Sequence, residues 1–180
     1  KKITLLLILI FFSCKNPSSK SNEKDETIDD IEYVDLIGSF NRTDLNKDPY
    51  RSWFLKNYEN YELDLETASR LKKLINRKIK IEVIMGTWCS DSRDNVPGFF
   101  KLMDHVKFRK RNIELIGLDV DKKNPNEDEL KYEIINVPTF IFYNNEKEIN
   151  RIVELTIESL EKDILKILDG SGYQNAYYGF

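Results

Sequence analysis

The residues of this chain with the clearest chemical potential form one short stretch, Trp88-Cys89-Ser90-Asp91-Ser92. This stretch follows an apolar, strand-like run at 79–85 and opens a helix-like run at 91–111. A cysteine at a strand-to-helix turn is close to unpaired backbone N–H groups and to the positive end of the helix dipole. Both favour the thiolate, which is the nucleophilic form of the side chain. The sequence therefore predicts a reactive thiol at Cys89.

Three neighbours are expected to modify this thiol. Ser92 can donate a hydrogen bond to the sulfur from one turn further along the helix, and Arg93 adds positive charge. Asp91 opposes both, because it is negative and competes for the same N–H groups. A thiolate attacks a disulfide and forms a mixed disulfide. Ser92 cannot displace that product, so release needs an external thiol or a second cysteine of the substrate.

The elements around this turn alternate between strand-like and helix-like patterns. A helix capped by Asp64 is expected at 64–76, and Gly170 ends the last helix. After Cys89 we expect a strand at 113–120, a helix at 127–134, strands at 139–143 and 148–153, and a helix at 157–169. The order β-α-β-α-β-β-α predicts an α/β domain with a mixed sheet covered by helices.

The chain resembles the thioredoxin family over residues 62–170. Trp88-Cys89, Pro97, the acidic pair Asp119 and Asp121, and the segment Val137-Pro138-Thr139 all stand where that family has related residues. The resemblance implies a thioredoxin-like fold, thiol–disulfide chemistry, and a cis Pro138 that faces Cys89. It also implies that Trp88, Val137, Pro138 and Thr139 bind the substrate, by pairing an extended segment with exposed backbone groups.

Two positions depart from the family. Ser92 replaces the second cysteine, and Val83 stands where thioredoxins commonly bury an aspartate that assists proton transfer. The resemblance therefore implies a monothiol variant, with Cys89 and Ser92 as the catalytic pair. Such a site suits isomerase-like, deglutathionylating or thiol-capping reactions better than net reduction by a dithiol.

The N-terminal segment resembles a bacterial lipoprotein signal. Lys1 and Lys2 precede the apolar run 3–12, which is shorter than the ~20 residues that span a bilayer and typical of a secretory signal. Ser13-Cys14 ends this run like a lipobox, so Cys14 is expected to carry the lipid. The chain is then similar to lipid-anchored thioredoxin-like proteins of Bacteroidetes-like envelopes, at the periplasmic face or the cell surface. An ordinary signal peptide or a buried strand are the alternatives.

The expected organisation has five parts. Residues 15–30 are polar and form a tether, because they cannot bury enough apolar surface to offset their ordering entropy. The parts are a signal peptide at 1–13, the anchor and tether at 14–30, an aromatic-rich, partly helical extension at 31–61, the thioredoxin-like domain at 62–170, and a tail at 171–180.

The composition limits the functions. Charged residues make up 33% of the chain and the net charge is −3. The chain therefore lacks the excess of positive charge that attracts nucleic acid. No Gly-rich phosphate loop and no metal-ligand spacing stands out, so neither a cofactor nor a metal is expected. The expected partners are disulfide- or thiol-bearing envelope proteins, glutathione-like thiols, and the membrane through the lipid anchor.

Several residues have simpler interpretations. Cys89 can be an inert buried residue, and Pro138 can be a trans loop proline. His105, the single histidine, is a solvated helix residue or half of a Cys–His dyad. Asp119 and Asp121 end a strand or bind calcium, although Lys123 and Asn124 break the EF-hand pattern. The functional alternative to an oxidoreductase is a non-catalytic thioredoxin-fold module that binds an envelope protein.

Overall fold

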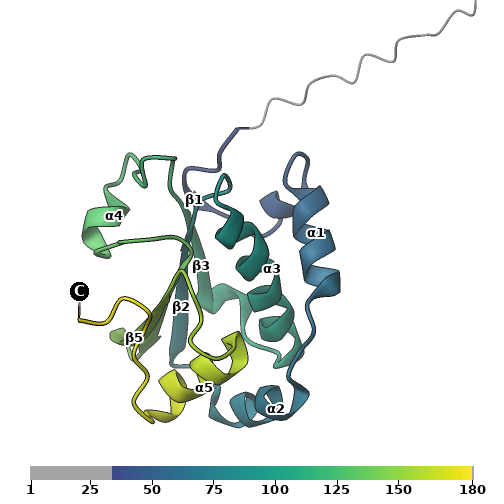
Figure 1. Ribbon diagram of the computed structural model, residues 1–180, viewed down its shortest axis with the longest axis vertical. Helices are drawn as coiled ribbons and strands as arrows, with labels where there is room; N and C mark the ends of the chain where they lie inside the picture. The colour runs from purple at the N-terminus through teal and green to yellow at the C-terminus, as the bar shows by residue number, and fades with distance from the viewer. Residues whose placement is uncertain (1–33, 180) are drawn as a thin grey trace, which may run out of the picture. The chain divides into compact units, whose positions relative to one another are not determined.

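The computed structural model describes residues 34–179 (Figure 1). The predictions for the signal peptide at 1–13, for Cys14, for the tether and for the first residues of the extension therefore lie outside the described residues. The described residues form one compact unit. Its elements are β1 (Gly38–Phe40), α1 (Arg51–Asn60), α2 (Leu65–Leu74), β2 (Ile79–Met85), α3 (Ser90–His105), β3 (Ile113–Gly117), α4 (Asp128–Lys131), β4 (Thr139–Asn144), β5 (Lys147–Val153) and α5 (Leu160–Asp169).

The strands form a mixed five-stranded sheet in the order β1-β3-β2-β4-β5. Only the β2–β3 pair is parallel; β1 pairs antiparallel with β3, and β4 pairs antiparallel with both β2 and β5. The crossover between the parallel strands contains α3, as a βαβ unit requires. This is the predicted α/β architecture, and it places the carboxyl end of the central strand β2 directly before the turn that carries Cys89.

Two apolar cores lie on opposite faces of this sheet. Alternate residues of a strand point to opposite faces. Ile81, Val83 and Met85 of β2 pack into the larger core with residues of α1, α2, α3 and α5, whereas Ile84 joins a smaller core with Tyr132, which follows α4. Figure 1 shows α1, α2 and α3 on one side of the sheet and α4 on the other. The buried Val83 is thus part of the main core, in place of the acid that the family commonly buries there.

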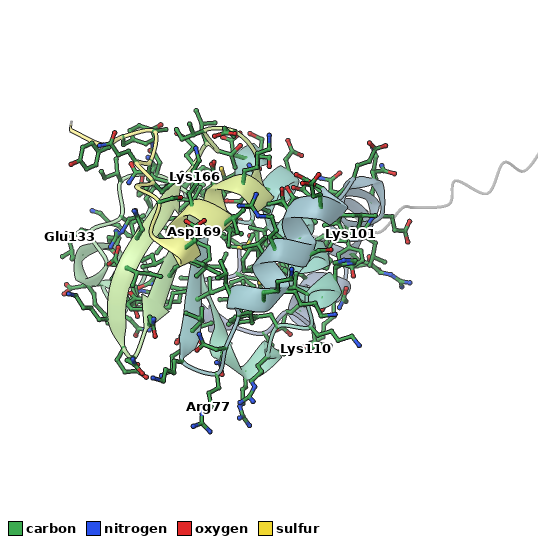
Figure 2. All side chains as sticks on the ribbon, turned by 90° about the horizontal axis from the view of Figure 1, so that it is seen from below. Arg77, Lys101, Lys110, Glu133, Lys166 and Asp169 are labelled. Atoms are coloured by element: carbon green, nitrogen blue, oxygen red, sulfur yellow. The ribbon has the colours of Figure 1, made fainter. Side chains whose placement is uncertain are left out.

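The surface carries charges of both signs. Figure 2 shows the side chains of Arg77 and Lys110 pointing away from the ribbon into solvent, and both residues are exposed.

Among the helices at residues 34–179, none combines the length and the apolar character that crossing a bilayer requires.

The aromatic-rich extension is part of the folded unit. It supplies β1 at the edge of the sheet and α1, which packs against α3. Phe54 of α1 is fully buried and contacts Phe100 of α3 edge-to-face, with ring centroids 6.0 to 6.3 Å from its aromatic neighbours. Gly117 allows the close approach of this segment, because a Cβ there would lie 1.8 Å from the Leu36 carbonyl oxygen.

A polar cluster also ties the extension to α3. Arg42 makes two contacts with the Asp104 carboxylate, at 2.9 and 2.7 Å, and Tyr58 donates to the same carboxylate at 2.9 Å. The guanidinium carbon lies 4.6 Å from the Phe100 ring centroid. Burial alone would raise the pKa of Asp104, but the hydrogen bonds from Arg42 and Tyr58 outweigh it and lower that pKa.

We expect this cluster to make the stability depend on pH. A carboxyl group with a lowered pKa stabilises the fold above its unfolded pKa of about 3.9, and this contribution is lost as the pH falls through the lower folded value. An Asp104→Asn variant should lose about 1–2 kcal/mol of unfolding free energy at pH 7, because Arg42 keeps a half-buried charge without its partner. Urea titrations at several pH values should show this difference shrinking below pH 4.

A matched control removes a charge from an exposed ion pair. Glu146 contacts Lys80 at 2.5 Å, and its side chain is 73% exposed. Glu146→Gln should change the unfolding free energy by less than about 0.5 kcal/mol. An Asp104→Asn loss that stays constant down to pH 2 would contradict the account of the cluster.

The helix predicted at 91–111 is shorter in the structure, and this prediction was wrong at its C-terminal end. α3 ends at His105 because Lys107 adopts a left-handed conformation, with φ 59°. Phe108 N then donates to Met103 O at 2.8 Å, which closes the helix with a Schellman-type bond. The turn lets Phe108 enter the core. No glycine marks this stop, so the sequence pattern did not reveal it.

Three other predicted bounds also shift. The strand predicted to reach Val120 ends at Gly117, and the following loop is held by Asp119 Oδ1, which accepts from the backbone N–H groups of Asp121 and Lys123. The helix predicted at 127–134 is only the single turn α4. The helix predicted from 157 begins at Leu160, because Ser159 caps it and accepts from Lys162 N.

Candidate active site

The turn between β2 and α3 positions the cysteine. Cys89 is the N-cap of α3; its N–H donates to Gly86 O at 3.0 Å, and its carbonyl accepts from Arg93 N at 3.1 Å. Trp88 is fixed by its indole N–H, which donates to Leu118 O at 3.0 Å. Gly86 is needed beneath this ring, since a Cβ there would lie 2.5 Å from the Trp88 indole. The predicted strand–turn–helix arrangement around Cys89 is therefore present.

The sulfur of Cys89 faces the segment before β4. The thiol donates to Val137 O at 3.3 Å, and the Val137–Pro138 peptide bond is cis. Cys89 is 8% exposed, and Pro138 and Thr139 are also buried. The Thr139 hydroxyl donates to Asn136 O at 2.6 Å, so it braces the loop from within. The structure thus brings Cys89, Val137 and Pro138 together as the resemblance implies.

The sulfur opens into a small pocket of about 310 Å³. Residues 88–91 line one side of it, and Lys122, Asn136, Val137 and Glu154 line the other. The pocket lies beyond the carboxyl end of β2, the end of the sheet at which α/β proteins commonly bind ligands. Four residues were predicted to bind the substrate. Two of them, Trp88 and Val137, line this pocket.

Ser92 lies behind the sulfur, away from the pocket. Its side chain is 0% exposed, and Oγ accepts a hydrogen bond from Gly86 N at 3.3 Å. This bond ties the first turn of α3 to the end of β2. The hydrogen bond that the sequence suggested, from the Ser92 hydroxyl to the sulfur, stays a prediction.

The two charged neighbours of Cys89 are oriented differently. Arg93 Nε donates to Thr87 O at 2.6 Å, and its guanidinium carbon lies 5.9 Å from the Trp53 ring centroid. Arg93 does not line the pocket, whereas Asp91 does. The negative neighbour therefore borders the pocket, and the positive one does not.

Three pocket-lining residues, Lys122, Asn136 and Glu154, and Tyr177, which contacts one of them, were not among the site residues that the sequence predicted. Lys122 donates to Ile135 O at 3.0 Å and to Asn136 Oδ1 at 2.5 Å. Asn136 Nδ2 donates to Glu154 Oε2 at 3.0 Å, and the Tyr177 hydroxyl donates to the same oxygen. Of these residues, only Glu154 could have been found from the sequence. Pairing the last two predicted strands places the residue after Val153 beside Pro138. In the structure, Glu154 N donates to Pro138 O at 2.8 Å.

The structure separates His105 from Cys89 and places Asp119 and Asp121 in the loop after β3. His105 is the exposed last residue of α3, and Cys89 caps the first, so about 24 Å of helix separates them. A Cys–His dyad is thereby ruled out. Within residues 34–179, no group of three or more His, Cys, Asp or Glu side chains is placed to hold a metal ion.

A mixed sheet, a cysteine at the N-terminus of the helix after its central strand, and a cis proline opposite the sulfur define a thioredoxin-like protein. The family model described as thioredoxin matches residues 40–161. The chain belongs to the thioredoxin family.

Individual relatives are distant. Thioredoxin H4-2 of Oryza sativa subsp. japonica is 25% identical over 113 residues, which cover 63% of this chain and 77% of that protein. A protein of unknown function from Pseudomonas aeruginosa superposes with a TM-score of 0.50 at 19% identity, over 68% of this chain and 85% of the other. Fasciola hepatica thioredoxin gives a TM-score of 0.38 at 25% identity, over 58% and 94% of the two chains.

Proposed function

We propose that this protein is an envelope thiol–disulfide oxidoreductase of the monothiol type, with Cys89 as its nucleophile. Membership of the thioredoxin family supports thiol–disulfide chemistry in general. The observation that carries the monothiol mechanism is local. The Cys89 sulfur lines a pocket beside the cis Val137–Pro138 segment, and the residue one turn further along α3 is a buried serine.

The reaction begins with attack of the Cys89 thiolate on one sulfur of a substrate disulfide. Cys89 is the N-cap of α3, its side chain makes no capping hydrogen bond, and its thiol donates to Val137 O. A new sulfur–sulfur bond forms with Cys89, and the substrate's other sulfur leaves as a thiolate. The Val137 carbonyl, which accepts from the resting thiol, is freed when that proton is lost.

The second half of the cycle needs a partner. Cys89 is the free cysteine of the described residues, so no thiol there can resolve the mixed disulfide. An external thiol such as glutathione, or a second cysteine of the substrate, must attack the Cys89-linked sulfur. The proposed reactions are therefore disulfide isomerisation or removal of thiol adducts in envelope proteins, near a membrane to which Cys14 tethers the domain.

The low exposure of Cys89 favours a second candidate, a non-catalytic module that binds an envelope protein through the same pocket. In that case the thiol would be a small buried side chain held by Val137 O, and binding would not depend on its chemistry.

Trapping of mixed disulfides separates the two functions. Envelope extracts prepared without reductant and alkylated in acid should contain adducts of the protein that disappear in Cys89→Ala and collapse on reduction. Ser92→Ala is the matched control: it keeps the nucleophile, so its adducts should persist. If no Cys89-dependent adduct forms and Cys89→Ala still binds its partner, the protein is the binding module.

A further inference from the structure

The mouth of the Cys89 pocket carries more negative than positive charge. Three ionisable side chains line it besides Cys89: the carboxylates of Asp91 and Glu154 and the ammonium group of Lys122. Asp91 is in the first turn of α3, and Glu154 follows β5, so the two acids flank the sulfur from different elements.

Glu154 is held in place by three hydrogen bonds to two parts of the chain, the loop at 136–138 and the C-terminal segment. Its backbone N–H donates to Pro138 O at 2.8 Å, next to the cis peptide. Its carboxylate accepts from Asn136 Nδ2 at 3.0 Å and from the hydroxyl of Tyr177. Figure 1 shows the C-terminal segment that carries Tyr177 beside β5, on the side of the molecule away from α1. The negative charge of Glu154 is therefore a fixed feature of the pocket.

The positive groups nearby do not balance the two acids. Lys122 is turned toward neutral acceptors, Ile135 O and Asn136 Oδ1, and supplies one charge. Arg93 donates to Thr87 O and lies over Trp53, outside the pocket lining. The dipole of α3 contributes about half a positive charge, but it is directed at the sulfur itself. An approaching molecule meets a net negative charge.

We propose that this pocket selects cationic disulfides, namely protein disulfides flanked by lysine or arginine side chains, over anionic ones such as oxidised glutathione. This inference rests on the proposed function and adds its substrate class. Opposite charges raise the local concentration of a substrate and the rate of encounter, whereas like charges lower both. The attack is the same for each substrate: the Cys89–sulfur bond forms, the substrate's sulfur–sulfur bond breaks, and the departing thiolate takes a proton from water.

Three small disulfides of similar length test the proposal. Cystamine is cationic, 2-hydroxyethyl disulfide is neutral, and dithiodipropionate is anionic. The full chain carrying Cys14→Ser leaves Cys89 as its one cysteine, and mass spectrometry gives the rate of mixed-disulfide formation. Each rate is divided by that of 1-thioglycerol, a neutral thiol that differs from all three leaving thiols, with the same disulfide, which removes intrinsic differences in reactivity.

The expected cystamine-to-dithiodipropionate ratio is roughly 10 at low salt, because the net charge lies in the lining of the pocket that also holds the reacting sulfur. It should fall toward 1 in about 1 M salt, where the screening length is about 3 Å. Glu154→Gln should lower the low-salt ratio to about 3 or less, because Lys122 then balances Asp91. The control Glu146→Gln should leave it unchanged, since Glu146 follows the far end of β4, about 20 Å from Pro138.

The outcomes separate this inference from the proposed function. A normalised ratio near 1, or a ratio that Glu154→Gln and salt leave unchanged, overturns the charge selection while the thiol chemistry stands. If none of the three disulfides, including the neutral one, forms a mixed disulfide with Cys89, both the proposed function and the charge selection are overturned.

Discussion

A Ser92→Cys variant should release both thiols of a disulfide substrate, whereas the natural protein should release one. When the reduced natural protein meets an excess of a protein disulfide without added thiol, the reaction should stop at the mixed disulfide with Cys89. In Ser92→Cys, the new thiol should attack that intermediate, expel the second substrate thiol and leave a disulfide between Cys89 and the sulfur introduced at position 92. Counting released thiols and weighing the product by mass spectrometry distinguish the two results.

The expected acceleration is large because the resolving step becomes intramolecular. Residues three apart on a helix are neighbours, and their Cβ atoms are about 5–6 Å apart, close enough for a disulfide after a small adjustment. An intramolecular thiol acts at an effective concentration far above millimolar. Release should therefore be at least about 100-fold faster than with about 1 mM external thiol.

Two controls frame this result. Ser92→Ala removes the hydroxyl without adding a sulfur, so it should stall like the natural protein. Cys89→Ala combined with Ser92→Cys should form no adduct at the buried position 92, since Ser92 is 0% exposed and does not line the pocket. Should the natural protein already release two thiols per substrate, the monothiol mechanism would be wrong.

The fold was predictable where apolar periodicity and end signals agree. β2 has the predicted bounds, because its apolar run is flanked by polar turns on both sides. α2 begins where Asp64 was expected to cap it, with Asp64 Oδ1 accepting from Thr67 N at 3.1 Å. The end of α3 was missed because Lys107, a residue without a preference for left-handed backbone, forms the stop. β1 was missed because three residues at a sheet edge leave no pattern.

The site was predictable only as far as the family resemblance reached. The pairing of Cys89 with the Val137–Pro138 segment joins positions 48 residues apart, and no local pattern encodes that contact. The resemblance supplied it. Lys122, Asn136, Glu154 and Tyr177 belong to this chain's own loops and tail, where side-chain hydrogen bonds decide the arrangement. Lys122 and Glu154 supply two of the three charges at the pocket, and the third, Asp91, is the one that the sequence already placed beside Cys89.

Cys14→Ser should move the protein from the membrane fraction to the soluble envelope fraction. The reason is the lipid proposed at Cys14: two or more acyl chains hold a protein stably on a membrane, whereas one binds only marginally. The apolar run at 3–12 has ten residues, about half of what spans a bilayer, so it is a poor substitute for the anchor. The domain at residues 34–179 offers no membrane-spanning helix in its place.

The measurement is fractionation of bacterial cells that express the chain behind an initiating methionine, with metabolic labelling by an alkyne fatty acid. The natural sequence should be labelled and sediment with membranes, and Cys14→Ser should be unlabelled and soluble. Cys89→Ala is the matched control, because it removes the other cysteine and should leave both label and location unchanged. A labelled, membrane-bound Cys14→Ser protein would show that the attachment lies elsewhere.

With the anchor confirmed, Cys89 would act as a tethered thiol whose range is set by the tether at 15–30, so its substrates must be proteins that reach the same membrane surface.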